Sequence, residues 1–220
     1  AILCLDLATG AERWAWKEDG PSYASPILAS LGGGQLVAQT QNHVVGLKAS
    51  TGEFLWKLPF RTDYDQNSVT PLFAFSRLYV SGLGKGTHAQ LVRGKEVELL
   101  WRNHDHSFYM STPVPVGNSL IGLQHERKGS LVCLDAATGQ KRWEGPPRQG
   151  ENASVIAAGS VLLVVTEPGK LVVAAASEER YQELARYPLS ESPIWAHPAL
   201  VGRALYVKDA DTLRRFDLPE

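Results

Sequence analysis

The stretch "LDLATGAERW" at residues 5–14 returns almost unchanged as "LDAATGQKRW" at residues 134–143. A chain in which the sequence of one tight turn occurs twice is built from repeats, and the length of the repeat predicts the fold. The position before each turn recurs at steps of 42, 45, 42, 41 and 41, and a tryptophan stands eight positions later in the first four units. These anchors are Asp6, Lys48, Arg93, Asp135, Ala176 and Asp217, with Trp14, Trp56, Trp101 and Trp143, and with Leu184 in the fifth unit.

A second set of anchors has the same period. The triplets "ASP", "VTP", "STP", "ASV" and "AHP" begin at residues 24, 69, 111, 153 and 196. Between the anchors lie short runs rich in Val, Leu, Phe and Trp, divided by Gly, Ser and Asp, which is typical of strands. The register makes 177–187 a hairpin between third and fourth strands and not a helix. Four strands per unit of this length predict an all-β fold, a β-propeller of four-stranded antiparallel blades with about five blades in this chain.

The repeated turn has a structural reason. Gly10, Gly52 and Gly139 supply a residue that tolerates positive φ, and the side chains of Asp6 and Asp135 can bind backbone amides of the turn. We expect the tryptophan that follows to begin the outer strand and to pack against the next blade.

The motif resembles a known family. "CLDLATGAERW" and "CLDAATGQKRW" match Ala-x-Asp-x-x-Thr-Gly-x-x-x-Trp with Cys for Ala, "GLKASTGEFLW" keeps Thr51, Gly52 and Trp56, and "LVRGKEVELLW" keeps Trp101. This is similar to the tryptophan-docking repeat of quinoprotein-like (pyrroloquinoline-quinone-type, PQQ) β-propellers. The closing stretch "IWAHPALVGRALYVKDADTLRRFDL" resembles the end of bacterial secreted quinone-repeat propellers, which are similar to the propeller lipoprotein of the outer-membrane barrel assembly machinery.

The resemblance implies a seven- or eight-bladed propeller. The chain is expected to begin with the third and fourth strands of a blade, to run through four complete blades and to end with three strands, 21 in all. We therefore expect a single or partial propeller domain over 1–220 that forms the C-terminal part of a longer one, with a five-bladed closure as the alternative. The expected units are about 1–20, 21–62, 63–105, 106–147, 148–188 and 189–220.

The family also contains dehydrogenases, which hold the quinone over a tryptophan and under a disulfide between adjacent cysteines, and which bind calcium through Glu, Asn and Asp. Here the cysteines are Cys4 and Cys133, at equivalent positions three blades apart. Blades so distant cannot bring two Cα atoms to the ~5.5 Å that a disulfide needs. We expect both to replace small buried alanines and expect no cofactor. The alternative is a quinone-dependent dehydrogenase, with PQQ and calcium, completed by a missing N-terminal half.

Charge and hydropathy limit the classes of partner that the chain can bind. Lys plus Arg is 22 and Asp plus Glu is 23, so the net charge is −1, without the basic stripe that nucleic-acid binding needs. The apolar run at 155–165 is about half the ~20 residues of a membrane span, and the opening residues are unlike a signal peptide. A periplasmic or secreted location is implied by the resemblance.

Other motifs carry little chemistry. "NHDH" at 103–106 lacks the partners of a metal site, so we expect no metal and loop capping instead. "GLGKG" at 82–86 lacks a phosphate-binding pattern and predicts a hairpin between second and third strands. A hydrolase that uses Asp63, Asp65 or Asp105 is a further reading, although no acid pair is visible from spacing.

The loops that join each fourth strand to the next first strand gather aromatic, amide and imidazole groups. They predict a ligand-binding site formed by Tyr23, Tyr64, Asp65, Asn67, His106, Tyr109, Asn152, Trp195 and His197. Such groups suit a protein or peptide partner, or a small polar ligand; the alternative is that the loops are merely solvated. We therefore expect a non-enzymatic binding or scaffolding module, whose partner could also be its own N-terminal half.

Overall fold

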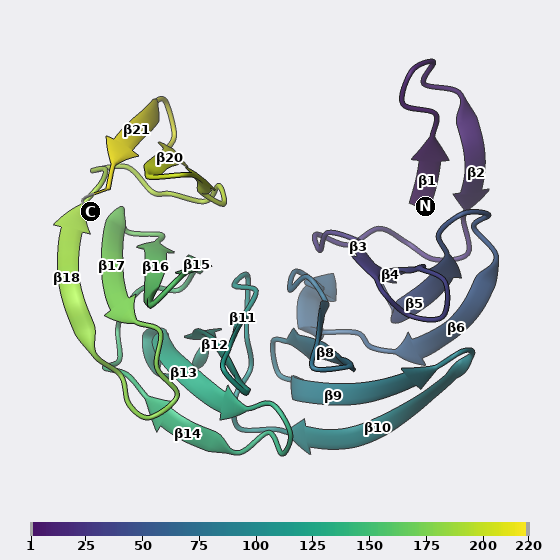
Figure 1. The fold of residues 1–220 in the computed structure, drawn as a ribbon, viewed down its shortest axis with the longest axis horizontal. Helices are drawn as coiled ribbons and strands as arrows, with labels where there is room; N and C mark the ends of the chain where they lie inside the picture. The colour runs from purple at the N-terminus through teal and green to yellow at the C-terminus, as the bar shows by residue number, and fades with distance from the viewer. Residues whose placement is uncertain (1, 219–220) are drawn as a thin grey trace. The chain divides into compact units, whose positions relative to one another are not determined.

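The computed structural model describes residues 2–218, and within them the chain is all-β, as predicted (Figure 1). The strands form antiparallel sheets in chain order: one of two strands, four of four strands and one of three strands. This is the predicted succession of 21 strands. The chain divides into two compact units between Ser107 and Phe108.

The first unit contains three sheets (Figure 1, purple to teal). The strands of the first are β1 (Ile2–Leu5) and β2 (Glu12–Trp16); those of the second are β3 (Ile27–Ala29), β4 (Gln35–Gln39), β5 (His43–Lys48) and β6 (Phe54–Pro59). The third consists of β7 (Leu72–Ala74), β8 (Arg77–Gly82), β9 (Gly86–Arg93) and β10 (Glu96–Asn103). A single 3-10 turn, η1 (Asp63–Asp65), precedes the third sheet in the described chain.

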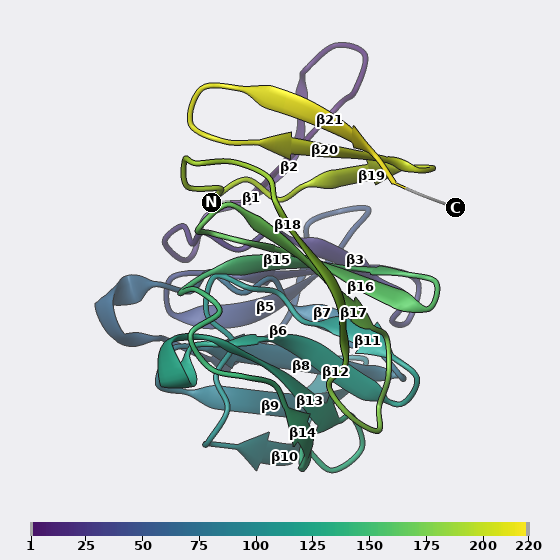
Figure 2. The same ribbon diagram turned by 90° about the vertical axis from the view of Figure 1, so that its left-hand side faces the viewer.

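The second unit also contains three sheets. The strands of the first are β11 (Val114–Val116), β12 (Ser119–Gln124), β13 (Ser130–Asp135) and β14 (Lys141–Glu144), with η2 (Glu126–Lys128) between β12 and β13. Next come β15 (Ala153–Ala158), β16 (Val161–Thr166), β17 (Lys170–Ala175) and β18 (Glu183–Pro188). The last sheet, β19 (Ala199–Val201), β20 (Ala204–Lys208) and β21 (Leu213–Asp217), lies beside β15–β18 (Figure 2).

The repeated turn has the predicted chemistry. The Oδ1 atom of Asp6 accepts hydrogen bonds from the amides of Ala8 and Thr9 and from the Thr9 hydroxyl, at 3.0–3.1 Å. Gly10 has φ +71° and donates its amide to the Asp6 carbonyl. Asp135 repeats the same contacts, so the near-identical letters encode one turn geometry.

Each motif tryptophan lies opposite a small residue on the preceding strand of its sheet. The pairs are Cys4 with Trp14, Gly46 with Trp56, Ala89 with Trp101, and Cys133 with Trp143. The pairing register shifts just before each indole, which marks a β-bulge. The small partner leaves room for the ring: a Cβ built on Gly46 would lie 2.1 Å from the Trp56 indole. Both cysteines are free thiols, and a small residue is needed at each position because a tryptophan lies opposite it.

The fifth unit corrects the sequence alignment. The hairpin between β17 and β18 is two residues longer than the turns that begin at Asp6, Lys48 and Asp135, because the Ala175 amide binds the Gln182 carbonyl, whereas the Asp135 amide binds that of Gln140. Ala185, paired with Val173, therefore holds the tryptophan position, and Leu184 is the bulge residue. The sequence, aligned without a gap, placed Leu184 there.

Apolar clusters fill the spaces between successive sheets within each unit. In the first unit, one cluster joins Trp16 to Val45 and Leu47, and another joins Trp56 to Leu78. Two further clusters occupy the corresponding spaces of the second unit. Successive side chains of a strand point to opposite faces of its sheet, so neighbours such as Val44 and Val45 contribute to different clusters.

Candidate functional site

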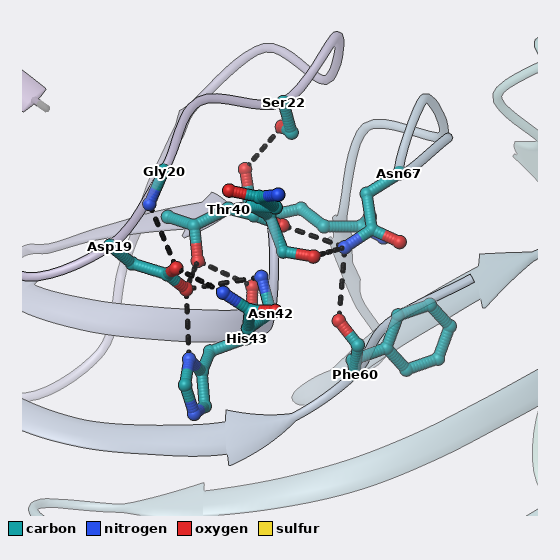
Figure 3. Close-up of polar contacts among 10 residues, drawn as sticks. Asp19, Gly20, Ser22, Thr40, Asn42, His43, Phe60 and Asn67 are labelled. Carbon is teal, nitrogen blue, oxygen red and sulfur yellow. Dashed lines mark hydrogen bonds and ion pairs between the residues drawn. The ribbon is translucent and has the colours of Figure 1, made fainter. Parts of the chain in front are cut away.

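The loop at residues 17–26 is fixed to the β4–β5 turn of the following sheet by Asp19 (Figure 3). Its carboxylate accepts hydrogen bonds from the hydroxyl of Thr40 at 2.7 Å, the side-chain amide of Asn42 at 2.6 Å and Nδ1 of His43 at 2.8 Å. The amide of Gly20 adds a fourth bond. Burial alone would raise the pKa of the Asp19 carboxyl, but the bonds from His43, Thr40 and Asn42 outweigh it and hold the pKa well below its ordinary value. Asp19 is thus an ionised anchor of this loop.

Asn67 anchors the next loop, residues 60–71, in the same way (Figure 3). Its Oδ1 accepts bonds from the amide and hydroxyl of Thr62, both at 3.0 Å. Its Nδ2 donates to the carbonyls of Thr40, Gln41 and Phe60 at 2.6–3.1 Å. Asn67 is completely buried, and both ends of its amide are occupied by the protein itself.

A polar pocket of about 450 Å³ opens above this anchor, at the tip of the 60–71 loop. Its lining includes Arg61, Asp63, Tyr64 and Asp65 from the loop and Lys85 from the β8–β9 turn. Nε of Arg61 donates to Asp65 at 2.6 Å, and this bond is the main reason that the pKa of the Asp65 carboxyl is lowered. Tyr64 is 86% exposed. The pocket therefore presents one free phenol ring among charged groups.

The loops of the second unit are interlocked through their backbones. The Gln149 amide donates to the Gly129 carbonyl at 3.0 Å, the Glu167 amide to the Asn152 carbonyl at 2.9 Å, and the Ile194 amide to the Glu167 carbonyl at 2.9 Å. Each connecting loop is thereby bound to the turn between the second and third strands of a sheet. These bonds bring the tips of the loops at 145–152 and 189–198 to the β12–β13 and β16–β17 turns.

Trp195 lies where these segments meet. It is 64% exposed and lines a pocket of about 620 Å³ together with Lys128, Arg148, Glu151 and Glu167. We call this set the Trp195 site. An indole that is not packed into the core, surrounded by charges of both signs, can contact apolar and polar groups of a partner at once.

Both pockets contain residues in the left-handed backbone region. Tyr64 has φ +61°, Lys128 +61° and Arg148 +62°. Such angles are uncommon for residues other than glycine, and they recur where a side chain must be held in a particular direction for binding. These three pocket side chains extend from this backbone conformation, which Phe75, Ser76, Met110 and Arg127 adopt outside the two pockets.

The other residues predicted from the loops lie in varied surroundings. Tyr23 is 78% exposed, and its amide binds the Asn67 carbonyl. His106 is buried, and its carbonyl accepts a bond from the Thr87 hydroxyl at 2.9 Å. Tyr109 is half-buried, with its ring centroid 5.0 Å from that of His125, and burial raises its pKa.

Two predicted residues remain beside the Trp195 site. Asn152 is 7% exposed, and within residues 2–218 no group donates to its Oδ1. His197 is exposed, and its Nδ1 lies 2.9 Å from the carbonyl of Pro198. The structure thus brings Asp65 into one pocket and Trp195 into the other, and places Asn67 and His106 in the interior.

Sequence reasoning missed the charged residues that complete the pockets. Arg61 and Arg148 lie in the expected loops, whereas Lys85, Lys128 and Glu167 come from turns between second and third strands. Single charges at hairpin tips follow no spacing that would indicate a site. The repeat offers one usable signal, because those turns face the connecting loops in every unit.

The adjacent cysteine pair that the resemblance implies for the quinone site of dehydrogenases is not found among residues 2–218. Cys4 and Cys133 lie opposite Trp14 and Trp143 in different sheets, so they are not an adjacent pair. Within residues 2–218 no three His, Cys, Asp or Glu side chains are grouped as metal ligands. In the same residues no helix has the length and apolar character needed to cross a membrane.

Four-stranded sheets with this turn and this register define a PQQ-repeat β-propeller, the class that the sequence predicted. The chain belongs to the family described as outer membrane protein assembly factor BamB, whose model matches residues 1–219. The comparison with curated proteins returns no match.

Solved structures show the same fold. BamB from Moraxella catarrhalis is 18% identical with a TM-score of 0.73, and the match covers 97% of this chain and 65% of that one. The chain thus spans less than two thirds of that BamB structure. The computationally designed Ika8 protein is 16% identical, with a TM-score of 0.67 over 97% of this chain and 64% of that one. The quinohemoprotein alcohol dehydrogenase ADHIIG from Pseudomonas putida HK5 is 14% identical, with a TM-score of 0.60 over 92% and 42% of the two chains.

Proposed function

We propose that this chain is a non-enzymatic binding module that holds a protein partner at the Trp195 site and takes part in outer membrane protein assembly. The observation that carries the proposal is the exposed indole of Trp195 in a pocket with both cationic and anionic walls. Tryptophan and arginine are the residues that most often dominate the binding energy of a protein interface. The description of the family as an assembly factor supports the same role.

The charges favour a protein over a polyanion. Lys128 and Arg148 are matched in number by Glu151 and Glu167 around the indole, and the whole chain has a net charge of −1. Nucleic acid and acidic membranes require a surface of one positive sign. A polypeptide segment that carries both signs and an apolar side chain satisfies every wall of the pocket.

The proposal includes two further points. The first is that the chain acts without a quinone, and the second is that it is located in the periplasm. The cysteines support the first point, since both serve to accommodate an indole in their own sheets. Mixing the purified protein with PQQ and calcium is expected to give neither a bound-quinone absorbance nor dye reduction. Dye reduction that depends on both additions would support the dehydrogenase instead. The family description, which refers to the outer membrane, supports the location.

The binding test uses the purified outer-membrane assembly proteins of the source organism, titrated separately against this chain by calorimetry. Trp195→Ala is expected to weaken binding of the recognised protein by about tenfold or more, the usual size of an aromatic interface hot spot. Leu213→Ala is the matched control, because Leu213 is 68% exposed on β21, away from the site. The midpoint of thermal unfolding should change little in either variant. Equal affinities of the wild type and Trp195→Ala would contradict the proposal.

A further inference from the structure

The fifth sheet lacks the indole that the preceding sheets carry. Ala185 holds the tryptophan position on β18 and faces Val173 on β17. At the equivalent place Trp56 covers Gly46, and Trp143 covers Cys133. The sheet therefore has a methyl group where its relatives in the same chain have a large ring.

A groove is found at this place. It has a volume of about 660 Å³, and its lining includes Val161, Leu171, Val173 and Ala185 on one side and Phe216 on the other. The groove continues the apolar cluster between these two sheets, in which Leu163, Leu171 and Leu205 are buried and Val161, Val173 and Phe216 are half-buried. Replacing a large ring by a methyl group in a close-packed interface leaves a space lined by apolar side chains.

The corresponding positions elsewhere show what fills such a space. The Trp14 indole donates its N–H to the Ala49 carbonyl at 3.2 Å, and the ring packs on Gly52, where a Cβ would lie 2.6 Å from it. Trp143 donates to the Ser177 carbonyl at 2.9 Å, and its ring centroid lies 6.0 Å from that of Tyr181. In both cases an extended strand presents a tryptophan to the turn of the following sheet.

The backbone position that accepts the Trp14 bond has a counterpart at the groove. The Leu218 amide binds the Arg203 carbonyl, as the Ala49 amide binds the Gly34 carbonyl, so Leu218 is the equivalent of Ala49. Leu218 lines the groove, and its carbonyl accepts bonds from the Arg203 guanidinium at 2.8 and 3.0 Å. The carbonyl at this position is thus bound within the chain, and the groove offers the apolar part of the tryptophan contact.

We propose that this groove binds a tryptophan side chain presented by an extended segment of a protein partner. Tryptophan is chosen because the repeat places that side chain in the equivalent spaces, and an extended segment because β2 and β14 present it in that conformation. The inference goes beyond the proposed function, since the groove is built from strands and the Trp195 site from loops. A groove of this kind gains affinity from one buried aromatic anchor.

The probe is a capped peptide, Val-Thr-Trp-Thr-Val, compared with the same peptide carrying Ala in place of Trp. The tryptophan peptide is expected to bind the wild-type chain saturably by calorimetry, and the alanine peptide about tenfold more weakly or not at all. Free indole is titrated in parallel. Binding of free indole without binding of the peptide would identify a site for small aromatic molecules and overturn the proposal. Failure of both ligands to bind, or equal binding of the two peptides, would also overturn it.

The location is tested by filling the groove from within. The double variant Val173→Ala, Ala185→Trp restores the pair found in the other sheets and is expected to lower peptide affinity about tenfold and to raise the unfolding midpoint by several degrees. Leu184→Trp is the matched control, since it adds the same ring at the neighbouring half-exposed bulge residue, and it should bind the peptide normally. If the double variant does not fold, Ala185→Leu fills the groove with a smaller group and should weaken binding. Wild-type affinity in a folded variant with a filled groove would overturn the proposal.

Discussion

Asn67 shows how a polar loop residue can serve the fold. Each of its amide atoms is bound to other residues in the interior, and it joins the 60–71 loop to the β4–β5 turn. A buried polar group costs free energy when its partners are removed, because they lose their bonds without regaining water. The loop that presents Tyr64 therefore depends on Asn67 for its position.

Asn67→Ala is expected to lower the free energy of unfolding by about 2–4 kcal/mol, because two donors and three carbonyls would lose one shared partner. Urea denaturation followed by circular dichroism measures the change. Tyr23→Ala is the control from a neighbouring loop, and it should stay within about 0.5 kcal/mol of the wild type, because Tyr23 is 78% exposed. A change of under about 1 kcal/mol for Asn67→Ala would contradict the anchoring role.

His88 on β9 makes stability depend on pH. It is 6% exposed, its Nε2 donates to the Lys85 carbonyl at 2.8 Å, and its ring contacts Phe60. Burial lowers the pKa of His88 from the ordinary 6.5 to about 4, although the bond to Lys85 acts in the opposite direction. Between these two values the unfolded chain binds a proton that the folded chain does not, so stability falls as pH falls.

We expect His88 to cost on the order of 3 kcal/mol of stability between pH 6.5 and 4. Urea denaturation across that range should show a shallower pH dependence for His88→Gln than for the wild type. His197→Gln is the control, because His197 is an exposed residue. Parallel curves for the wild type and His88→Gln would show that the buried imidazole is not the group responsible.

At the scale of the strand pair, the motif tryptophans join one sheet to the next. Trp143 is 8% exposed, covers Cys133 and bonds to Ser177 in the next sheet of its unit. Trp56 acts less directly: its N–H binds Gln35 at 2.7 Å, and Gln35 donates to the Gly94 carbonyl of the next sheet at 3.2 Å. Trp143 therefore bonds directly to the hairpin of the next sheet, whereas Trp56 is connected to the equivalent hairpin through the Gln35 amide.

Trp143→Ala should lower the free energy of unfolding by about 3–5 kcal/mol, the usual cost of replacing a buried aromatic residue by alanine. Chemical denaturation measures this loss, with Leu184→Ala as the control on the half-exposed bulge of β18. The control should change the free energy by less than about 1 kcal/mol. Similar losses for the two variants would show that the indole does not stabilise the contact between sheets.

The strand order was predictable because the turn and the tryptophan recur at fixed spacing. The turn joins the last two strands of a sheet, and the tryptophan lies on the second of these two strands. The place of Ala185 at the tryptophan position was not predictable, because the β17–β18 hairpin is two residues longer than the Asp135 turn on which the alignment was based. The length of this hairpin is set by the hydrogen bond from the Ala175 amide to the Gln182 carbonyl, and no residue type in the sequence indicates that bond. The groove beside Ala185 was for the same reason invisible in the sequence.

At the scale of the molecule, the positions of the loops were predictable and the directions of their side chains were not. Trp195 and Tyr64 point to solvent, whereas Asn67 and His106 are buried in loops of similar composition. Which loop residue turns inward depends on the carbonyls that the neighbouring turn leaves unpaired. Lys85 and Lys128 come from turns distant in sequence, so only the folded sheets bring them to the pockets.

Site-specific photo-crosslinking in living cells of the source organism tests most directly whether the loops bind the partner. A benzophenone amino acid replaces Trp195 or Tyr64 in the loops and, as controls, the exposed Leu28 on β3 or Leu3 on β1. We predict one discrete crosslinked outer-membrane assembly protein from the loop positions and none from the strand positions. Crosslinks from Leu28 and Leu3 without any from Trp195 and Tyr64 would contradict a binding function of the loops.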